Sequence, residues 1–62
     1  MKYNELHRLL RKAGCIEVGQ MSGHRRWLNP KTGEHFATSN HLSAEVAAGT
    51  LRKILKMAGI KN

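Results

Sequence analysis

Histidine is the residue type in this sequence that is best suited to catalysis. The chain of 62 residues contains four histidines. Its four acidic residues are all glutamates, and they are too scattered to predict a two-carboxylate or two-metal site. Histidine takes up or releases a proton near neutral pH without help from its surroundings. If the protein is an enzyme, we therefore expect a histidine to move the proton.

His24 is the best candidate because of the residues around it. Its neighbours in the sequence are Ser22, Gly23, Arg25, Arg26 and Trp27. A base beside cations suits cleavage of an RNA backbone, since the base removes the proton of a 2′-hydroxyl and the cations neutralise charge on the phosphate oxygens. This reaction needs no metal, and it is confined to RNA because DNA lacks the 2′-hydroxyl. On residue type and spacing alone, an exposed histidine without a role is the commoner outcome.

A zinc site would be another use of such side chains. Four residues are suitable ligand types, namely Cys15, His24, His35 and His41, but no two of them have the close spacing of structural zinc modules. We therefore expect neither a metal nor any other cofactor.

Further contacts to RNA are expected outside the His24 segment. Lys31 and three cations near the C-terminus would bind phosphates, the three being Arg52, Lys53 and Lys56. A solvated helical face is an equally good explanation of those three. Trp27 is a candidate for stacking on a base, although a domain with few aromatic residues more often uses its tryptophan in the core.

Net charge points to a polyanionic partner. Eleven lysines and arginines against four acidic residues give a net charge of +7, which indicates nucleic acid, and RNA in particular, before a membrane or an acidic protein. No apolar run approaches the length of a membrane-spanning helix, and the first residues do not resemble a signal peptide. One cysteine allows no disulfide within the chain, so a cytoplasmic location is expected.

Two segments have the periodicity of amphipathic helices. The first covers residues 4–13, with Asn4 as its N-cap and Gly14 as the left-handed residue that ends it. Its apolar stripe consists of Leu6, Leu9, Leu10 and Ala13. The second begins near residue 49 and ends at Gly59 and Ile60. Its stripe consists of Leu51, Ile54, Leu55 and Ala58.

Three strands are expected between these helices, over residues 15–21, 24–28 and 34–39. Ile16 and Val18 should form the buried face of the first strand, and Phe36 and Thr38 should share one face of the third. Ser22-Gly23 and the segment 29–33 are turns. The segment 43–46 fits either a helical turn or a loop.

The expected architecture is therefore α+β, in the order α-β-β-β-α, as a single domain over residues 1–62. A three-stranded antiparallel sheet would carry both helices on one face and leave the other face open. This is the layout of a double-stranded-RNA-binding-like fold.

Motifs along nearly the whole chain carry a family resemblance. They are Gly14-Cys15, Ser22-Gly23-His24, Asn29-Pro30, the segment 38–41 and the segment 49–60. The last of them, Gly-Thr-Leu-Arg-x-Ile-Leu-Lys-x-Ala-Gly-Ile, is the most specific. With these motifs the sequence resembles the HicA toxins, small mRNA interferases of bacterial and archaeal toxin–antitoxin pairs.

The resemblance implies ribosome-independent cleavage of mRNA and a HicB antitoxin that covers the active site. The family's catalytic histidine lies in a Gly-Ser-His motif and corresponds to His24, and a second family histidine corresponds to His41. This chain has Ser22 and Gly23 in the opposite order. It also has Ser39 where a proline is usual and Cys15 where an aromatic residue is often found.

The leading hypothesis is thus the endoribonuclease toxin of a type II toxin–antitoxin system, with His24 as catalytic residue. Supporting roles are expected for Ser22, Gly23, Trp27 and His41. The proton donor that partners His24 is left open between water, His41 and His35. One alternative is a non-catalytic RNA-binding module on the same fold. Another is a basic module that docks on an acidic protein.

Overall fold

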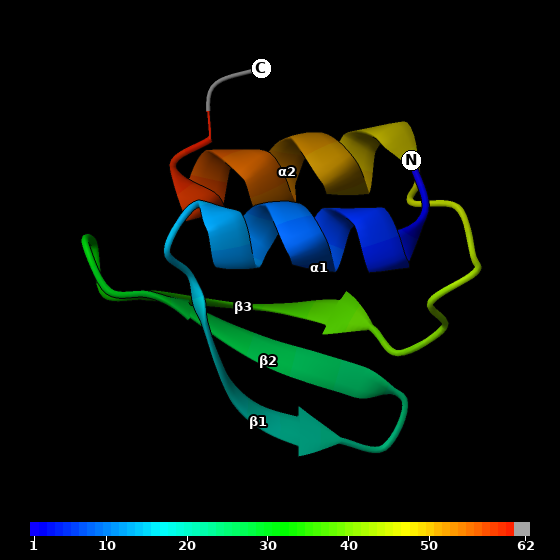
Figure 1. Cartoon of the computed structure of the whole chain (residues 1–62), viewed down its shortest axis with the longest axis horizontal. Helices are drawn as coiled ribbons and strands as arrows, with labels where there is room; N and C mark the ends of the chain where they lie inside the picture. Colours follow the sequence, from blue (N-terminus) through cyan, green and yellow to red (C-terminus); the bar gives the residue numbers. More distant parts are fainter. Residues whose placement is uncertain (61–62) are drawn as a thin grey trace.

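The computed structural model describes residues 1–60 and contains five elements in the expected order (Figure 1). They are α1 (Tyr3–Lys12), β1 (Ile16–Met21), β2 (His24–Asn29), β3 (Glu34–Ser39) and α2 (Ala48–Ala58). The strands pair antiparallel in the order β1-β2-β3. This confirms the α-β-β-β-α prediction. The expected domain extends to residue 62, and its last two residues lie outside the described ones.

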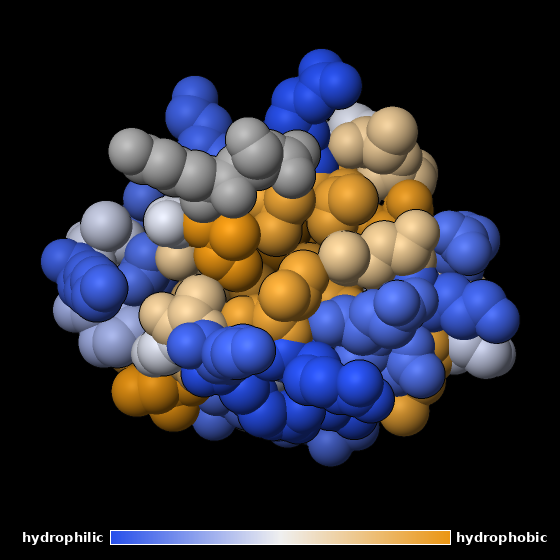
Figure 2. Space-filling view, turned by 45° about the horizontal axis from the view of Figure 1, so that its top comes forward, coloured by the Kyte–Doolittle hydropathy of each residue, from blue (hydrophilic) through white to orange (hydrophobic). Residues whose placement is uncertain are grey.

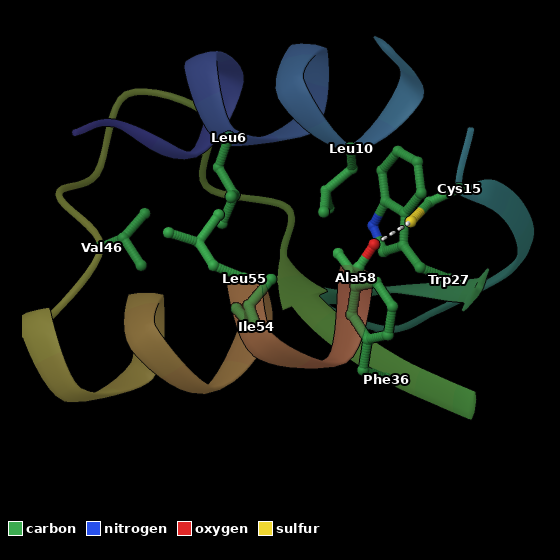
Figure 3. Close-up of a cluster of buried hydrophobic side chains, with 9 residues drawn as sticks. All are labelled: Leu6, Leu10, Cys15, Trp27, Phe36, Val46, Ile54, Leu55 and Ala58. Carbon is green, nitrogen blue, oxygen red and sulfur yellow. Dashed lines mark hydrogen bonds between the residues drawn. The ribbon is translucent and has the colours of Figure 1, made fainter. Parts of the chain in front are cut away.

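Both helices lie on one side of the sheet and run in the same direction (Figure 1). Strand alternation explains which residues they cover. Trp27 on β2 pairs with Phe36 on β3, and both side chains are buried. The helices complete the core (Figure 3). α1 contributes Leu6 and Leu10, and α2 contributes Ile54, Leu55 and Ala58.

The helical layer keeps some apolar surface on its outer side. Figure 2 shows this surface over the helices, bordered by hydrophilic side chains. Leu51, Met57 and Ile60 pack against the core and are only partly buried. The polar residues of a chain this short do not cover its whole core, which is normal for a small domain.

The prediction that Ile16 and Val18 form a buried face is wrong. The two side chains are 49% and 46% exposed. Ile16 pairs with Leu28, which is on the opposite face of β2 from Trp27, and a register shift between Glu17 and Gly19 leaves Val18 in a bulge. β1 is also an edge strand, and α2 packs on β2 and β3 instead.

The prediction that Asn4 caps α1 is also wrong, because the cap is Lys2. The first N–H groups of the helix have partners that are distant in the sequence. Tyr3 donates to the Ala44 carbonyl at 3.1 Å and Asn4 to the Leu42 carbonyl at 3.0 Å. The segment after β3 therefore replaces a side-chain cap, and local sequence could not reveal this.

The segment 43–46, for which the sequence allowed either a helical turn or a loop, is a loop. It is tied to the N-terminus by an isolated bridge between Lys2 and Glu45 and by the Val46 N–H, which donates to the Met1 carbonyl at 2.9 Å. Both predicted helix ends are confirmed: Gly14 and Gly59 have φ values of 97° and 75°.

Candidate functional site

His24 lies at the start of β2, directly after a two-residue turn. Met21 pairs with His24 across this turn, so the hairpin closes immediately before the histidine. Gly23 has φ 76°, whereas no residue other than glycine has a positive φ in the described chain. The turn therefore needs glycine in its second position. The order Ser22-Gly23 meets that need.

The imidazole of His24 is exposed and has one hydrogen-bond partner within residues 1–60. Its Nδ1 lies 3.3 Å from the backbone carbonyl oxygen of Ser22. A carbonyl oxygen only accepts hydrogen bonds, so this contact favours the tautomer with the proton on Nδ1. Nε2 then keeps its lone pair. A neutral His24 in this state is a proton acceptor that faces solvent.

The loop after β3 reaches the same end of the sheet. His24 pairs with Ser39, and the Asn40 N–H donates to the Gly23 carbonyl at 3.1 Å. His41 follows directly; it is exposed, and its N–H donates to the Ser39 hydroxyl at 3.0 Å. The structure thus places Asn40, which precedes His41, against Gly23, which precedes His24.

His35 lies elsewhere on the open face. It pairs with Leu28 near the other end of β2, four residues along β3 from Ser39. Four residues of strand span roughly 13 Å. His35 is therefore separated from His24 by most of the length of the sheet.

The two arginines after His24 lie on opposite faces. Arg26 shares the open face with His24, is exposed, and makes no side-chain hydrogen bond or ion pair within residues 1–60. Arg25 lies on the helix side, where its Nε donates to Asn40 Oδ1 at 3.0 Å. Its NH1 atom is 3.5 Å from Glu17 Oε1. Only Arg26 is free to meet a phosphate beside His24.

The remaining expected phosphate contacts are distant from His24. Lys31 follows the far end of β2, in the turn before β3. Lys53 and Lys56 of α2 line a shallow pocket with Glu34, which begins β3 at the end opposite Ser39. Arg52 is exposed on the same helix. The structure does not bring these cations to His24.

Trp27 is part of the core and has no exposed surface. Its Nε1–H donates to Thr38 Oγ1 at 3.0 Å, and the Arg11 guanidinium lies 5.4 Å from the ring centroid. A base cannot stack on a ring that is covered in this way. The core interpretation of Trp27 is the one that the structure supports.

His7 is a buried histidine to which the sequence assigned no role. It is 1% exposed, its Nε2 lies 2.6 Å from Thr38 Oγ1, and its Nδ1 has no hydrogen-bond partner among the described residues. Burial lowers the pKa of His7 below its ordinary 6.5, and Arg25 and Arg11 lower it further. His7 lies four residues after Tyr3 and three before Leu10, so it borders the apolar stripe, and this spacing was the available signal.

The candidate zinc ligands are not gathered at one place. Within residues 1–60, no three His, Cys, Asp or Glu side chains are grouped as ligands. Cys15 is buried, with its Sγ 4.0 Å from the Ala58 carbonyl oxygen (Figure 3), and this burial raises the pKa of its thiol. Neither helix of the described chain is long and apolar enough to cross a membrane.

Comparison with known proteins gives one match. The model of a protein family described as the HicA toxin of bacterial toxin-antitoxin matches residues 3–60. Neither a search of curated proteins nor one of solved structures found a significant match. The matched range includes all five elements and the exposed His24 at the start of β2. The chain therefore belongs to the HicA toxin family of bacterial toxin–antitoxin systems.

Proposed function

We propose that this protein is a metal-independent endoribonuclease that cleaves mRNA with His24 as its catalytic base. The observation that carries this proposal is the contact between His24 Nδ1 and the Ser22 carbonyl, 3.3 Å apart in an exposed side chain. It holds the ring by one nitrogen and leaves Nε2 available to a substrate. Membership of a toxin family supports an attack on an essential cellular molecule.

The reaction begins with transfer of a 2′-hydroxyl proton to His24 Nε2. The 2′-oxygen then forms a bond to the adjacent phosphorus, and the bond from that phosphorus to the 5′-oxygen of the next nucleotide breaks. The leaving oxygen takes up a proton. The products are a 2′,3′-cyclic phosphate and a 5′-hydroxyl. Arg26, on the same face as His24, stabilises the charge on the phosphate oxygens.

His41 is the protein group that we assign as proton donor to the leaving oxygen. Its backbone lies beside the turn that carries His24, because Asn40 is hydrogen-bonded to Gly23. His35 is ruled out for this step by its place near the other end of β2, roughly 13 Å along the strand. Water is the competing donor, and loss of the alkaline limb of the pH–rate profile in His41→Ala would distinguish His41 from it.

The other cations bind RNA away from the cleaved bond. Lys31, Lys53 and Lys56 lie near the opposite end of the sheet from His24 and would contact phosphates several nucleotides away. Arg52 on α2 would extend that contact. These residues therefore contribute to substrate affinity rather than to the chemical step.

An acidic antitoxin of the HicB type is the partner that we propose. Family membership indicates an antitoxin, and a chain with a net charge of +7 associates fastest with an acidic one. Because His24 is exposed at the end of a hairpin, a bound protein would block substrate without changing the fold. Both proteins would act in the cytoplasm, where mRNA is available.

The test compares wild type with His24→Ala and His35→Ala on long single-stranded RNA in excess EDTA. The two variants are matched, since both histidines are exposed on the open face. We expect His24→Ala to lose about 100-fold or more in rate while it still folds and binds RNA. His35→Ala should cleave like wild type. RNA binding without cleavage by wild type would instead identify a non-catalytic RNA-binding module.

A further inference from the structure

Arg25 and Arg26 are adjacent and chemically identical, yet their surroundings differ. The Arg25 side chain is 18% exposed and contacts Asn40 and Glu17, whereas Arg26 is exposed on the other face. We propose that Arg25 is a positioning residue, which holds His41 beside His24 through its hydrogen bond to Asn40. This inference rests on the proposed ribonuclease function and adds a role to a residue that the sequence had suggested as a phosphate ligand.

Asn40 is held at two points. Its N–H donates to the Gly23 carbonyl at 3.1 Å, and its side-chain Oδ1 accepts from Arg25 Nε at 3.0 Å. Gly23 precedes His24, and His41 follows Asn40. Next to the pairing of His24 with Ser39, Asn40 therefore adds a second connection between the segments that carry the two histidines. Breaking its side-chain bond would leave the start of the loop held by backbone N–H groups alone, those of Asn40 and His41.

The charge of Arg25 is partly compensated within the protein, by a carboxylate that it shares with Arg11. Glu17 Oε1 lies 3.5 Å from Arg25 NH1 and 3.3 Å from Arg11 NH2. Glu17 sits on β1, so Arg25 connects β1, β2 and the loop after β3. Arg25 donates its Nε–H to Asn40, approaches Glu17 through NH1 and is only 18% exposed, so little of its guanidinium can reach a phosphate. The Arg26 side chain is exposed and makes no such contact within residues 1–60.

Arg25→Lys is the substitution that separates positioning from phosphate binding. Lysine keeps the positive charge and can still approach Glu17, but it has a methylene group where arginine has Nε–H. The bond to Asn40 is therefore lost while the charge stays. A phosphate contact would survive this change, because lysine binds phosphate as a point charge.

The expected kinetic effect is on kcat rather than on KM. A displacement of about 1 Å at a catalytic group can lower a rate about 100-fold, so we expect Arg25→Lys to lower kcat by about 10- to 100-fold. KM and the salt dependence of RNA binding should stay unchanged. The alkaline limb of the pH–rate profile, which reports the general acid, should weaken because His41 is no longer held in place.

The experiment measures kcat, KM and pH–rate profiles for wild type, Arg25→Lys, Asn40→Ala and the double variant. The two single changes break the same bond, so their effects on kcat should not add. Arg26→Lys is the matched contrast on the open face, and Arg8→Lys on the exposed side of α1 is the neutral control. Arg8→Lys should leave both parameters unchanged, and urea unfolding identifies any variant that is merely unstable.

Three results decide the proposal. It is overturned if Arg25→Lys cleaves like wild type, or if the effects of Arg25→Lys and Asn40→Ala are fully additive. Absence of cleavage by wild type overturns the proposed function instead. In that case, amide hydrogen exchange at Asn40 still tests the contact: faster exchange in Arg25→Lys supports it, and an unchanged rate contradicts it.

Discussion

At the scale of single residues, strand alternation decides which side chains are free to react. His24 and Arg26 share the open face of the sheet, and Arg25 and Trp27 share the covered face. The segment 24–27 therefore has two sets of side chains, one on each face of the sheet. One set faces solvent, where the proposed RNA substrate would bind. The other is used by the protein itself.

Thr38 is the partner of two buried polar groups. Its hydroxyl oxygen accepts from Trp27 Nε1–H and lies 2.6 Å from His7 Nε2. Thr38→Val would leave both groups without a partner, and we expect the free energy of unfolding to fall by about 2 kcal/mol or more. Thr38→Ser keeps the hydroxyl and should lose about 1 kcal/mol for the missing methyl group. Urea unfolding measures both, and equal losses would contradict the assignment.

His7 should make stability depend on pH. Its folded-state pKa is lowered from 6.5 by burial and by Arg25 and Arg11, so the unfolded chain binds more protons just below that value. The free energy of unfolding should therefore not depend on His7 above about pH 6.5. It should fall as the pH drops from there toward the folded-state pKa of His7, with a slope of at most about 1.4 kcal/mol per pH unit.

Urea unfolding between pH 7.5 and 5.5 checks this slope. His7→Gln, which does not titrate but can still hydrogen-bond to Thr38, should remove the contribution. His35→Gln on the exposed face should leave the slope as in wild type. An unchanged slope in His7→Gln would show that another group is responsible.

At the scale of elements, local patterns predicted most of the fold and failed where partners are distant in the sequence. The alternation of Phe36 and Thr38 placed both on one face of β3 correctly, and this is the buried face. Ile16 and Val18 show the same alternation but lie on an edge strand with a bulge, and both are exposed. Asn4 has the side chain of an N-cap, but carbonyl groups of the loop after β3 accept from the first N–H groups of α1.

The candidate site was predictable to a similar degree. The position of His24 after a turn indicated an exposed side chain, and this is what the structure has. The sequence could not show that Arg25 is bonded within the protein and Arg26 is not. This difference depends on strand register and on Asn40, which is fifteen residues from Arg25. The burial of His7 could have been inferred from its spacing to Tyr3 and Leu10, which puts it at the border of the apolar stripe of α1.

Gly23, in the turn before His24, and Gly19, on β1, form a matched pair for substitution. Gly23 has φ 76°, whereas Gly19 on β1 does not have a positive φ, and a Cβ added at either would meet open space. Gly23→Ala should therefore lower the free energy of unfolding by about 1 kcal/mol, the strain of a left-handed alanine. Gly19→Ala should lower it much less. Thermal or urea unfolding compares them, and equal effects would contradict the turn geometry.

At the scale of the whole molecule, the proposed function assigns RNA affinity to the net charge and the chemical step to His24. With a net charge of +7, RNA binding should weaken as salt increases. Arg26→Gln removes one phosphate contact, so the slope of log K against log salt should become shallower by about 0.7 for single-stranded RNA. Titrations at several salt concentrations measure it, and an unchanged slope would remove Arg26 from the RNA contact.

The central claim is that His24 activates a 2′-hydroxyl, and the chemical ends of the cleavage products test this most directly. Wild-type protein is incubated in EDTA with an RNA and with the same sequence carrying 2′-O-methyl groups, and the fragments are analysed by mass spectrometry. The account requires 2′,3′-cyclic phosphate and 5′-hydroxyl ends from the RNA and no cleavage of the methylated strand. Fragments with 3′-hydroxyl and 5′-phosphate ends, or cleavage of the methylated strand, would contradict it.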